Sequence, residues 1–153
     1  CSSDLEELYA IAKPPGIESD LRATGKLLEI LAAWSAPERT TGGEDHAVRR
    51  YRALIEQHAG DPRSSLSELA KQVGMTPNHL AGLFRREYGV SPVEYRTLLR
   101  LVRAEQLLLA STLSAAEIAR EVGVPDPAYF TRVFQRANGM GPREFARKRR
   151  VGR

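Results

Sequence analysis

The sequence predicts an all-α fold: seven helices forming two helix-turn-helix motifs joined by a long central helix, preceded by a short helical N-terminal segment. The main observation is an internal repeat, in which residues 68–92 (ELAKQVGMTPNHLAGLFRREYGVSP) resemble residues 117–142 (EIAREVGVPDPAYFTRVFQRANGMGP). Each copy is a short helical segment, a turn containing Gly, and a second helix opened by Pro, which is the helix-turn-helix pattern. Regular capping signals support the helices, and the repeat region lacks the alternation typical of strands.

The two copies match at nearly constant offsets. Four residues recur 49 positions later and five recur 50 positions later, so a single inserted residue falls in the turn, where an insertion is best tolerated. The first group is Glu68, Ala70, Val73 and Gly74, matching Glu117, Ala119, Val122 and Gly123; the second is Pro77, Phe84, Arg86, Gly89 and Pro92, matching Pro127, Phe134, Arg136, Gly139 and Pro142.

Helix starts and ends are marked by capping residues. Ser65, Ser91 and Ser114 each precede a Glu by three positions, as in a capping box. A capping oxygen precedes Pro at Thr76-Pro77, Ser91-Pro92 and Asp126-Pro127. Glycines that tolerate the left-handed conformation are expected to end helices at Gly60, Gly74, Gly89, Gly123 and Gly139. These signals predict helices over 46–59, 66–73, 77–88, 92–110, 115–122, 127–137 and 142–149.

Apolar residues at helical spacing predict which faces are buried. The segment 92–110 is apolar on more than one side, so we expect it to bridge the two copies and to be buried by both. The other predicted inward faces are Val48, Tyr51, Leu54, Ile55 and His58; Leu80, Leu83, Phe84 and Tyr88; and Phe130, Val133, Phe134 and Ala137.

The N-terminal part has a different character. Residues 4–12 and 20–34 look like two amphipathic helices, and their apolar stripe could either form a dimer surface or pack on the same chain. We therefore divide the chain into a helical segment at 1–35, a linker at 36–44, and a domain at 45–150, with motif one at 66–88 and motif two at 115–137.

Charge is unevenly distributed along the chain, whose net charge is +4. Residues 1–43 hold four basic and seven acidic residues, a net of −3, and residues 44–153 hold nineteen basic and twelve acidic residues, a net of +7. The many arginines of residues 44–153 favour binding to the phosphate backbone of nucleic acid. The alternative is that the arginine content reflects the base composition of the genome. The terminal run 147–150 could likewise clamp phosphates or form a solvated tail.

Other function classes are disfavoured. There is no set of residues typical of catalysis, and His46, His58 and His79 are too scattered for a metal site, so we expect no enzyme, no metal and no cofactor. The single cysteine, Cys1, excludes internal disulfides and is typical of a reducing cytoplasm, where we expect the protein to lie with the nucleoid. No apolar run reaches the roughly 18 residues of a membrane span.

In a helix-turn-helix the second helix enters the major groove of DNA. Arg132 can bind guanine in a bidentate manner, Gln135 and Asn78 can pair with adenine, and the methyl group of Thr131 can contact thymine. His79 is expected to pack or cap near the groove, and Tyr129 could face the groove or be partly buried beside Phe130. We call the second helices of the two motifs, predicted at 77–88 and 127–137, the first and the second reader. The residues available to DNA are Asn78, His79, Ala81, Gly82, Arg85 and Arg86 in the first reader, and Ala128, Tyr129, Thr131, Arg132, Gln135 and Arg136 in the second.

Two features of the sequence affect whether both recognition helices can bind the same DNA duplex. Gly82 stands where the second copy has Arg132, and it either allows close approach to DNA or marks a degenerate reader. A connecting helix of about 19 residues spans roughly 28 Å, and successive major-groove faces lie about 34 Å apart. Both readers could therefore reach one face of a duplex.

The chain resembles the DNA-binding domain of the AraC/XylS family of bacterial transcription regulators over residues 48–148. The most specific stretches are GVPDPAYFTRVFQRANGMGPREF (123–145) and GMTPNHLAGLFRREYGVSPVEY (74–95). The resemblance implies two recognition helices in adjacent major grooves of promoter DNA, activation of transcription through RNA polymerase, and a largely absent N-terminal sensor or dimerisation domain of which residues 1–35 are the tail. By position, the family's base-contacting residues correspond to Asn78, Ala81, Gly82, Ala128, Thr131 and Arg132.

The chain departs from the family at Gly82, where Arg is common. An alternative therefore remains: a helical interaction module that binds polymerase or another regulator and whose DNA contact is vestigial. Gly82 and Ala128 are the residues that favour this alternative.

Overall fold

The computed structural model describes residues 42–151, and the side chains up to residue 148. The predicted helices within 1–35 and most of the linker lie outside these residues, and the side chains at the C-terminal end of the basic run 147–150 are not among those described. The described part contains seven helices and no strand, so the predicted all-α class is confirmed. They are α3 (Gly43–Gln57), α4 (Leu66–Val73), α5 (Pro77–Tyr88), α6 (Pro92–Ala110), α7 (Ala115–Glu121), α8 (Pro127–Asn138) and α9 (Pro142–Val151).

The three predicted capping boxes form as expected, at Ser65, Ser91 and Ser114. In the first, the amide of Glu68 donates to Ser65 Oγ (3.1 Å), and the amide of Ser65 donates to the Glu68 carboxylate (3.1 Å). The hydrogen bonds from Ser65 lower the pKa of Glu68 because they favour its charged form, and Ser114 does the same for Glu117.

Two of the predicted helix boundary signals are wrong, one at a helix start and one after a helix end. The side chain of Thr76 makes no capping hydrogen bond, although Pro77 does open α5, so Pro at the first position suffices there. Gly60 does not have a positive φ angle, because α3 has already ended at Gln57 with His58 as its cap. The left-handed conformation is confirmed at the other four glycines, Gly74, Gly89, Gly123 and Gly139.

Helix α3 also starts earlier than predicted, at Gly43 rather than residue 46, so the last two residues of the predicted linker are helical. Gly42 caps the helix with a φ of 73°, and Glu44 and Asp45 lie in its first turn. Acidic groups there interact favourably with the helix dipole, which stabilises the extra turn. Elsewhere the predicted bounds differ from the structure by two residues or fewer.

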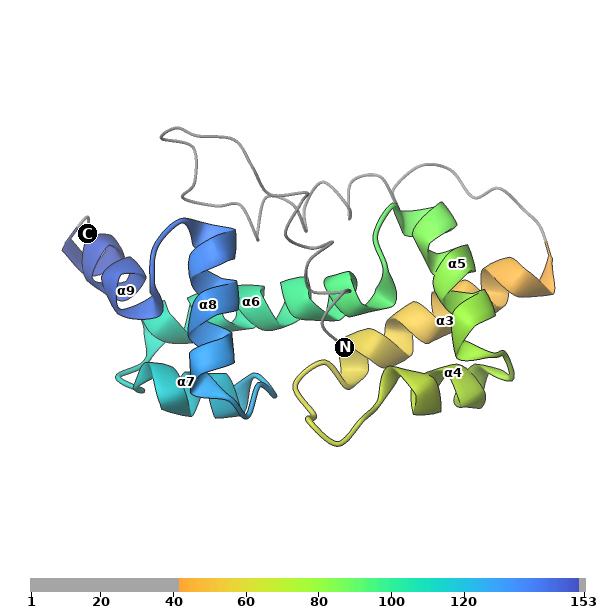
Figure 1. Cartoon of the computed structure of the whole chain (residues 1–153), viewed down its shortest axis with the longest axis horizontal. Coiled ribbons are helices and arrows are strands. Elements are labelled where there is room, and N and C mark those ends of the chain that lie inside the picture. The colour runs from red at the N-terminus through yellow and green to blue at the C-terminus, as the bar shows by residue number, and fades with distance from the viewer. Residues whose placement is uncertain (1–41, 152–153) are drawn as a thin grey trace.

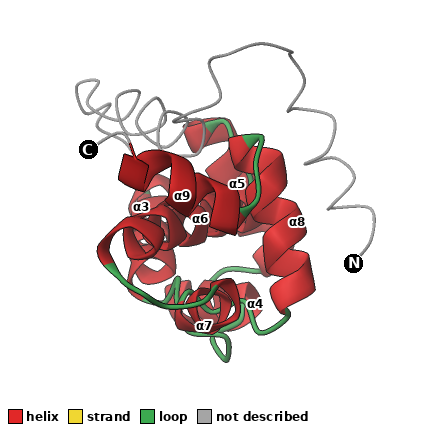
Figure 2. Ribbon diagram, turned by 90° about the vertical axis from the view of Figure 1, so that its left-hand side faces the viewer, coloured by secondary structure: helices red, strands yellow, loops and turns green. Residues whose placement is uncertain are grey.

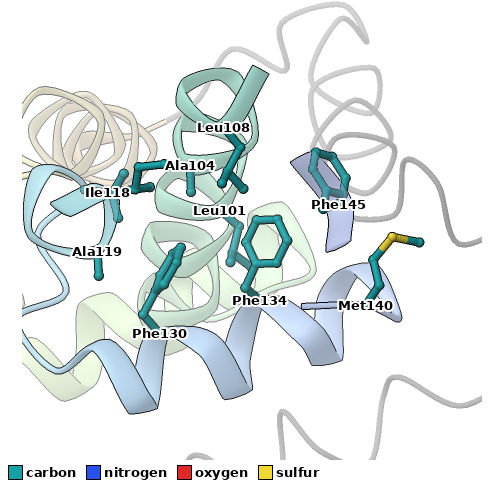
Figure 3. Close-up of a cluster of buried hydrophobic side chains, with 10 residues drawn as sticks. Leu101, Ala104, Leu108, Ile118, Ala119, Phe130, Phe134, Met140 and Phe145 are labelled. Carbon is teal, nitrogen blue, oxygen red and sulfur yellow. The ribbon is translucent and has the colours of Figure 1, made fainter. Parts of the chain in front are cut away.

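Helix α6 is shared by two hydrophobic cores, as predicted. Tyr95 packs in the first core with Leu80, Phe84 and Tyr51, and the ring centroids of Phe84 and Tyr95 lie 5.6 Å apart. The second core lies farther along the same helix (Figure 3). It contains Leu101, Ala104, Leu108, Ile118, Ala119, Val122, Phe130, Phe134, Met140 and Phe145. A helix buried at both ends in this way holds the two halves together.

The two motifs lie at opposite ends of α6 (Figure 1). Helices α5 and α8 both run across the direction of α6, one at either end of it. Viewed from the side, α5 and α8 both lie to the right of α3, α6 and α9, and α4 and α7 lie below (Figure 2). The second helices of both motifs are therefore on the same side of the molecule.

Candidate nucleic-acid interface

Helix α8 is anchored by one face and exposed on the other. Phe130 and Phe134 are 2% and 0% exposed, which confirms them as its inward face. Ala128, Arg132 and Gln135 are exposed, and Arg136 and Thr131 are half-buried. The side chains predicted to read bases are thus on the face that the core leaves open.

The start of α8 is held by Asp126. Its carboxylate accepts hydrogen bonds from the amides of Ala128 (2.9 Å) and Tyr129 (3.2 Å), as the capping prediction requires. One turn later, the hydroxyl of Thr131 donates to the carbonyl oxygen of Pro127 (2.8 Å). Because that hydrogen is used inside the helix, Thr131 can offer a base its methyl group and the acceptor capacity of its hydroxyl oxygen, but no donor.

Helix α5 has the same organisation. Leu80 and Phe84 are fully buried, and the predicted DNA-facing residues lie on the open face. Of these, Ala81 is half-buried, and the exposed ones are Asn78, His79, Gly82, Arg85 and Arg86. The two readers therefore present matching faces, each backed by its own core.

An acidic residue lies among the basic groups of α5. The carboxylate of Glu44, in the first turn of α3, lies 3.2 Å from His79 Nε2 and 3.9 Å from Arg86 Nη2. The prediction that His79 packs or caps is wrong, since its side chain is half exposed and pairs with Glu44. Exposed pairs of this kind contribute only about 0–1 kcal/mol, so both side chains can move to another partner.

The environment of Gly82 shows no packing reason for a glycine. A Cβ atom placed there would meet nothing within 4 Å, and its φ angle is not positive. The residue is exposed in the middle of α5. Nothing in the protein therefore excludes a larger side chain at this position.

Sequence reasoning missed two arginines on α6, Arg96 and Arg100. Arg100 Nε donates to the carbonyl oxygen of Ala59 (2.6 Å), and Arg96 Nη1 donates to that of Ser64 (3.0 Å). Burial lowers the pKa of both guanidinium groups, that of Arg100 to about 10, because desolvation disfavours the charged form. No sequence signal distinguishes these residues, since their partners are backbone carbonyls more than 30 positions away.

Tyr129 is half-buried beside Phe130, which was one of the two predicted alternatives. With Arg100, Val124 and neighbouring residues it lines a cavity of about 40 Å³ between α6 and α8. Pockets for small ligands measure about 300–1,000 Å³, so this cavity has room for little more than water.

Two further properties concern the described residues alone. In residues 42–151, no group of three or more His, Cys, Asp or Glu side chains lies close enough to hold a metal ion. None of the helices described there is long and apolar enough to cross a membrane.

Known proteins match both the sequence and the fold. The sequence profile of the family described as helix-turn-helix domain matches residues 69–148, just over half of the chain. The arabinose operon regulatory protein of Escherichia coli is 34% identical over 101 residues, covering 66% of this chain and 35% of that protein. The chain thus spans about a third of the length of the curated relatives it matches.

Two solved structures have the same fold. The C-terminal domain of AraT, a response regulator from Geobacillus stearothermophilus, aligns with a TM-score of 0.65 and 30% identity, covering 72% of this chain and 88% of that one. The DNA-binding domain of AdpA, solved in complex with a target DNA, aligns with a TM-score of 0.65 and 24% identity, covering 69% of this chain and 95% of that one. Together with the repeated motifs and the seven-helix fold, these matches show that the chain belongs to the AraC/XylS family of DNA-binding helix-turn-helix transcription regulators.

Proposed function

We propose that this chain is the DNA-binding part of a sequence-specific transcription regulator, which places α5 and α8 in adjacent major grooves of promoter DNA. The observation that carries the proposal is the placement of both helices on one side of the molecule, at the two ends of α6 (Figures 1 and 2). Their inner faces are buried in separate cores, and their outer faces are exposed. The family is a class of DNA-binding proteins, not of enzymes.

The second reader carries most of the base-specific chemistry in this proposal. Arg132 would bind guanine through O6 and N7, Gln135 would bind adenine through N6 and N7, and Thr131 would contact the methyl group of thymine. All three lie on the open face of α8. Ala128, at the start of the helix, and Arg136 would contact the sugar-phosphate backbone or the edge of the groove.

The first reader has fewer groups that distinguish bases. Asn78 can address adenine, whereas Ala81 and Gly82 offer no hydrogen bond to a base edge. His79, Arg85 and Arg86 would bind phosphates, which position the protein without reading the sequence. We therefore infer that the half-site under α8 is more restrictive than the half-site under α5.

The partners beyond DNA are also proposals. The resemblance supports activation through RNA polymerase in the cytoplasm. The apolar residues at helical spacing within residues 20–34 are compatible with a homodimer surface and equally with packing on the same chain. Light scattering tests the dimer, since a monomer mass that stays constant with concentration would exclude it. The alternative of an interaction module with vestigial DNA contact is not favoured, because the matched family binds DNA.

Selection of bound sites from a random duplex pool tests the proposal directly. We expect a two-part motif with its halves about one helical turn apart, because each half-site lies under one reader. Failure to enrich any motif, together with no binding to duplex DNA at low salt, would contradict the function.

Arg132→Ala tests the assignment of residues. We expect it to cost about 1–3 kcal/mol on the selected site and to relax the preference at one base pair. Arg103→Ala is the matched control, because it removes the same charge from an exposed residue of α6. If Arg132→Ala leaves the ratio of specific to random affinity unchanged, its assigned role is wrong.

A further inference from the structure

The loop between α3 and α4, residues 58–65, reaches from the first half of the molecule to the second. In Figure 1 its tip lies next to the turn between α7 and α8. A Cβ atom placed on Gly123, in that turn, would lie 2.4 Å from the carbonyl oxygen of Gly60 and 2.8 Å from its carbonyl carbon. The two backbones are therefore in direct contact, and only glycine at position 123 allows it.

Two arginines of α6 fasten the same loop. Arg100 donates to the carbonyl oxygen of Ala59 at 2.6 Å, and Arg96 donates to that of Ser64 at 3.0 Å. The arginines are four positions apart and so share one face of α6. They bind the loop near both of its ends, and Arg100 Nη2 also lies 3.2 Å from the Cβ position of Gly123.

These contacts extend to the second recognition helix. Tyr129, in the first turn of α8, lines one cavity with Arg100, and Thr97 and Leu101 of α6 line it too. A continuous set of contacts thus runs from the loop, through Arg100 and Gly123, to the start of α8. The central helix alone would leave α8 free to shift as α6 bends, whereas these contacts oppose such a shift.

We propose that this junction, formed by loop 58–65 with Arg96, Arg100 and Gly123, holds α8 at a fixed offset from α5 and so sets the half-site spacing that the protein accepts. The inference rests on the proposed reading of DNA by both helices. One base pair of added spacing moves a half-site by about 3.4 Å and rotates it by about 35°. A junction that permits little movement rejects a site shifted by one base pair, and a loosened junction tolerates it.

The test compares Gly123→Ala with Gly74→Ala. Gly74 is the equivalent glycine in the first motif, with a φ of 80° against 78° for Gly123. Both variants carry the same left-handed strain, but a Cβ on Gly74 meets nothing within 4 Å. Only Gly123→Ala therefore disturbs the junction.

The measurement is the affinity for duplexes in which the selected half-sites are separated by the selected spacing, or by one or two base pairs more or fewer. We expect the wild-type protein to lose tenfold or more at a shift of one base pair. Gly123→Ala should bind the duplex of selected spacing more weakly than the wild type does. Its profile of affinity against spacing should be flat, with the affinities for all these spacings within about threefold of one another. Gly74→Ala should keep the wild-type shape of the profile, whatever its absolute affinity.

Arg100→Met provides an independent test if Gly123→Ala does not fold, because it removes the donor to Ala59 and keeps an apolar stem. We expect the same flattened profile, and a sharper one for Arg100→Lys, which restores a donor. Folded junction variants with the wild-type profile would overturn the inference, as would a wild-type protein that binds its motif equally at all spacings. A wild-type protein that binds no duplex would instead overturn the proposed function.

Discussion

Asn138 is expected to weaken the fold at the end of the second recognition helix. Its side chain is 0% exposed, and neither its amide nitrogen nor its amide oxygen has a hydrogen-bond partner. In the first motif the equivalent position is Tyr88, whose ring packs in the core with its centroid 4.6 Å from that of Phe84. The second motif thus places a polar group where the first has an aromatic ring.

Asn138→Leu removes the buried polar atoms and keeps the number and branching of the heavy atoms. A buried polar group without a partner costs about 1–3 kcal/mol. We therefore expect the variant to raise the free energy of unfolding by about 1–3 kcal/mol. For a chain of this length, that corresponds to roughly 2–4 °C in Tm for each kcal/mol.

Urea unfolding followed by circular dichroism measures this free energy. Asn78→Leu is the matched control, since it makes the same change at an exposed position of α5. Its effect should stay within about 0.5 kcal/mol, as for most surface substitutions. If Asn138→Leu leaves the free energy of unfolding unchanged or lowers it, the amide is already satisfied by a buried water. The claim that an unpaired Asn138 amide destabilises the fold would then be wrong.

Two further predictions concern α5 and the capping boxes. Gly82→Arg should raise helix stability by about 1 kcal/mol and, on duplexes with guanine opposite α5, raise affinity by about 1–3 kcal/mol, because the position is open. Competition binding measures this, and no gain on any base would show that α5 does not face the base edges. The pKa values of Glu68 and Glu117 are lower in the folded protein than the ordinary 4.5. The contribution of the two ionised carboxylates to the free energy of unfolding is therefore complete above pH 4.5 and is lost as pH falls through the folded pKa values. Replacing both residues with Gln keeps the capping geometry and removes the titrating groups, so below pH 4.5 the free energy of unfolding should fall less steeply with pH than in the wild type. An identical slope in the two proteins would show that Glu68 and Glu117 do not cause this pH dependence.

Much of this molecule could be predicted from residues that interact locally. The Ser-x-x-Glu boxes, Pro at the first helical position and four left-handed glycines act within a few positions, so they mark helix ends without knowledge of the fold. The repeat identified both motifs, and the helical spacing of Phe130 and Phe134 identified the anchored face of α8. Where local signals erred, as at Thr76 and Gly60, the chain had an alternative way to start or end the helix.

Between residues 42 and 151, local sequence signals were enough to specify the helices and the buried face of each. Long-range contacts were needed to specify how the two halves are held together. Arg100 meets Ala59 across 41 positions, and Glu44 meets His79 across 35. The partners of Arg100 and Arg96 are carbonyl oxygens, which every residue carries, so no residue type marks these contacts in advance. Gly123 shows both levels at once: its left-handed turn follows from its place at the end of a helix, but its contact with Gly60 exists only because α6 brings the two halves together.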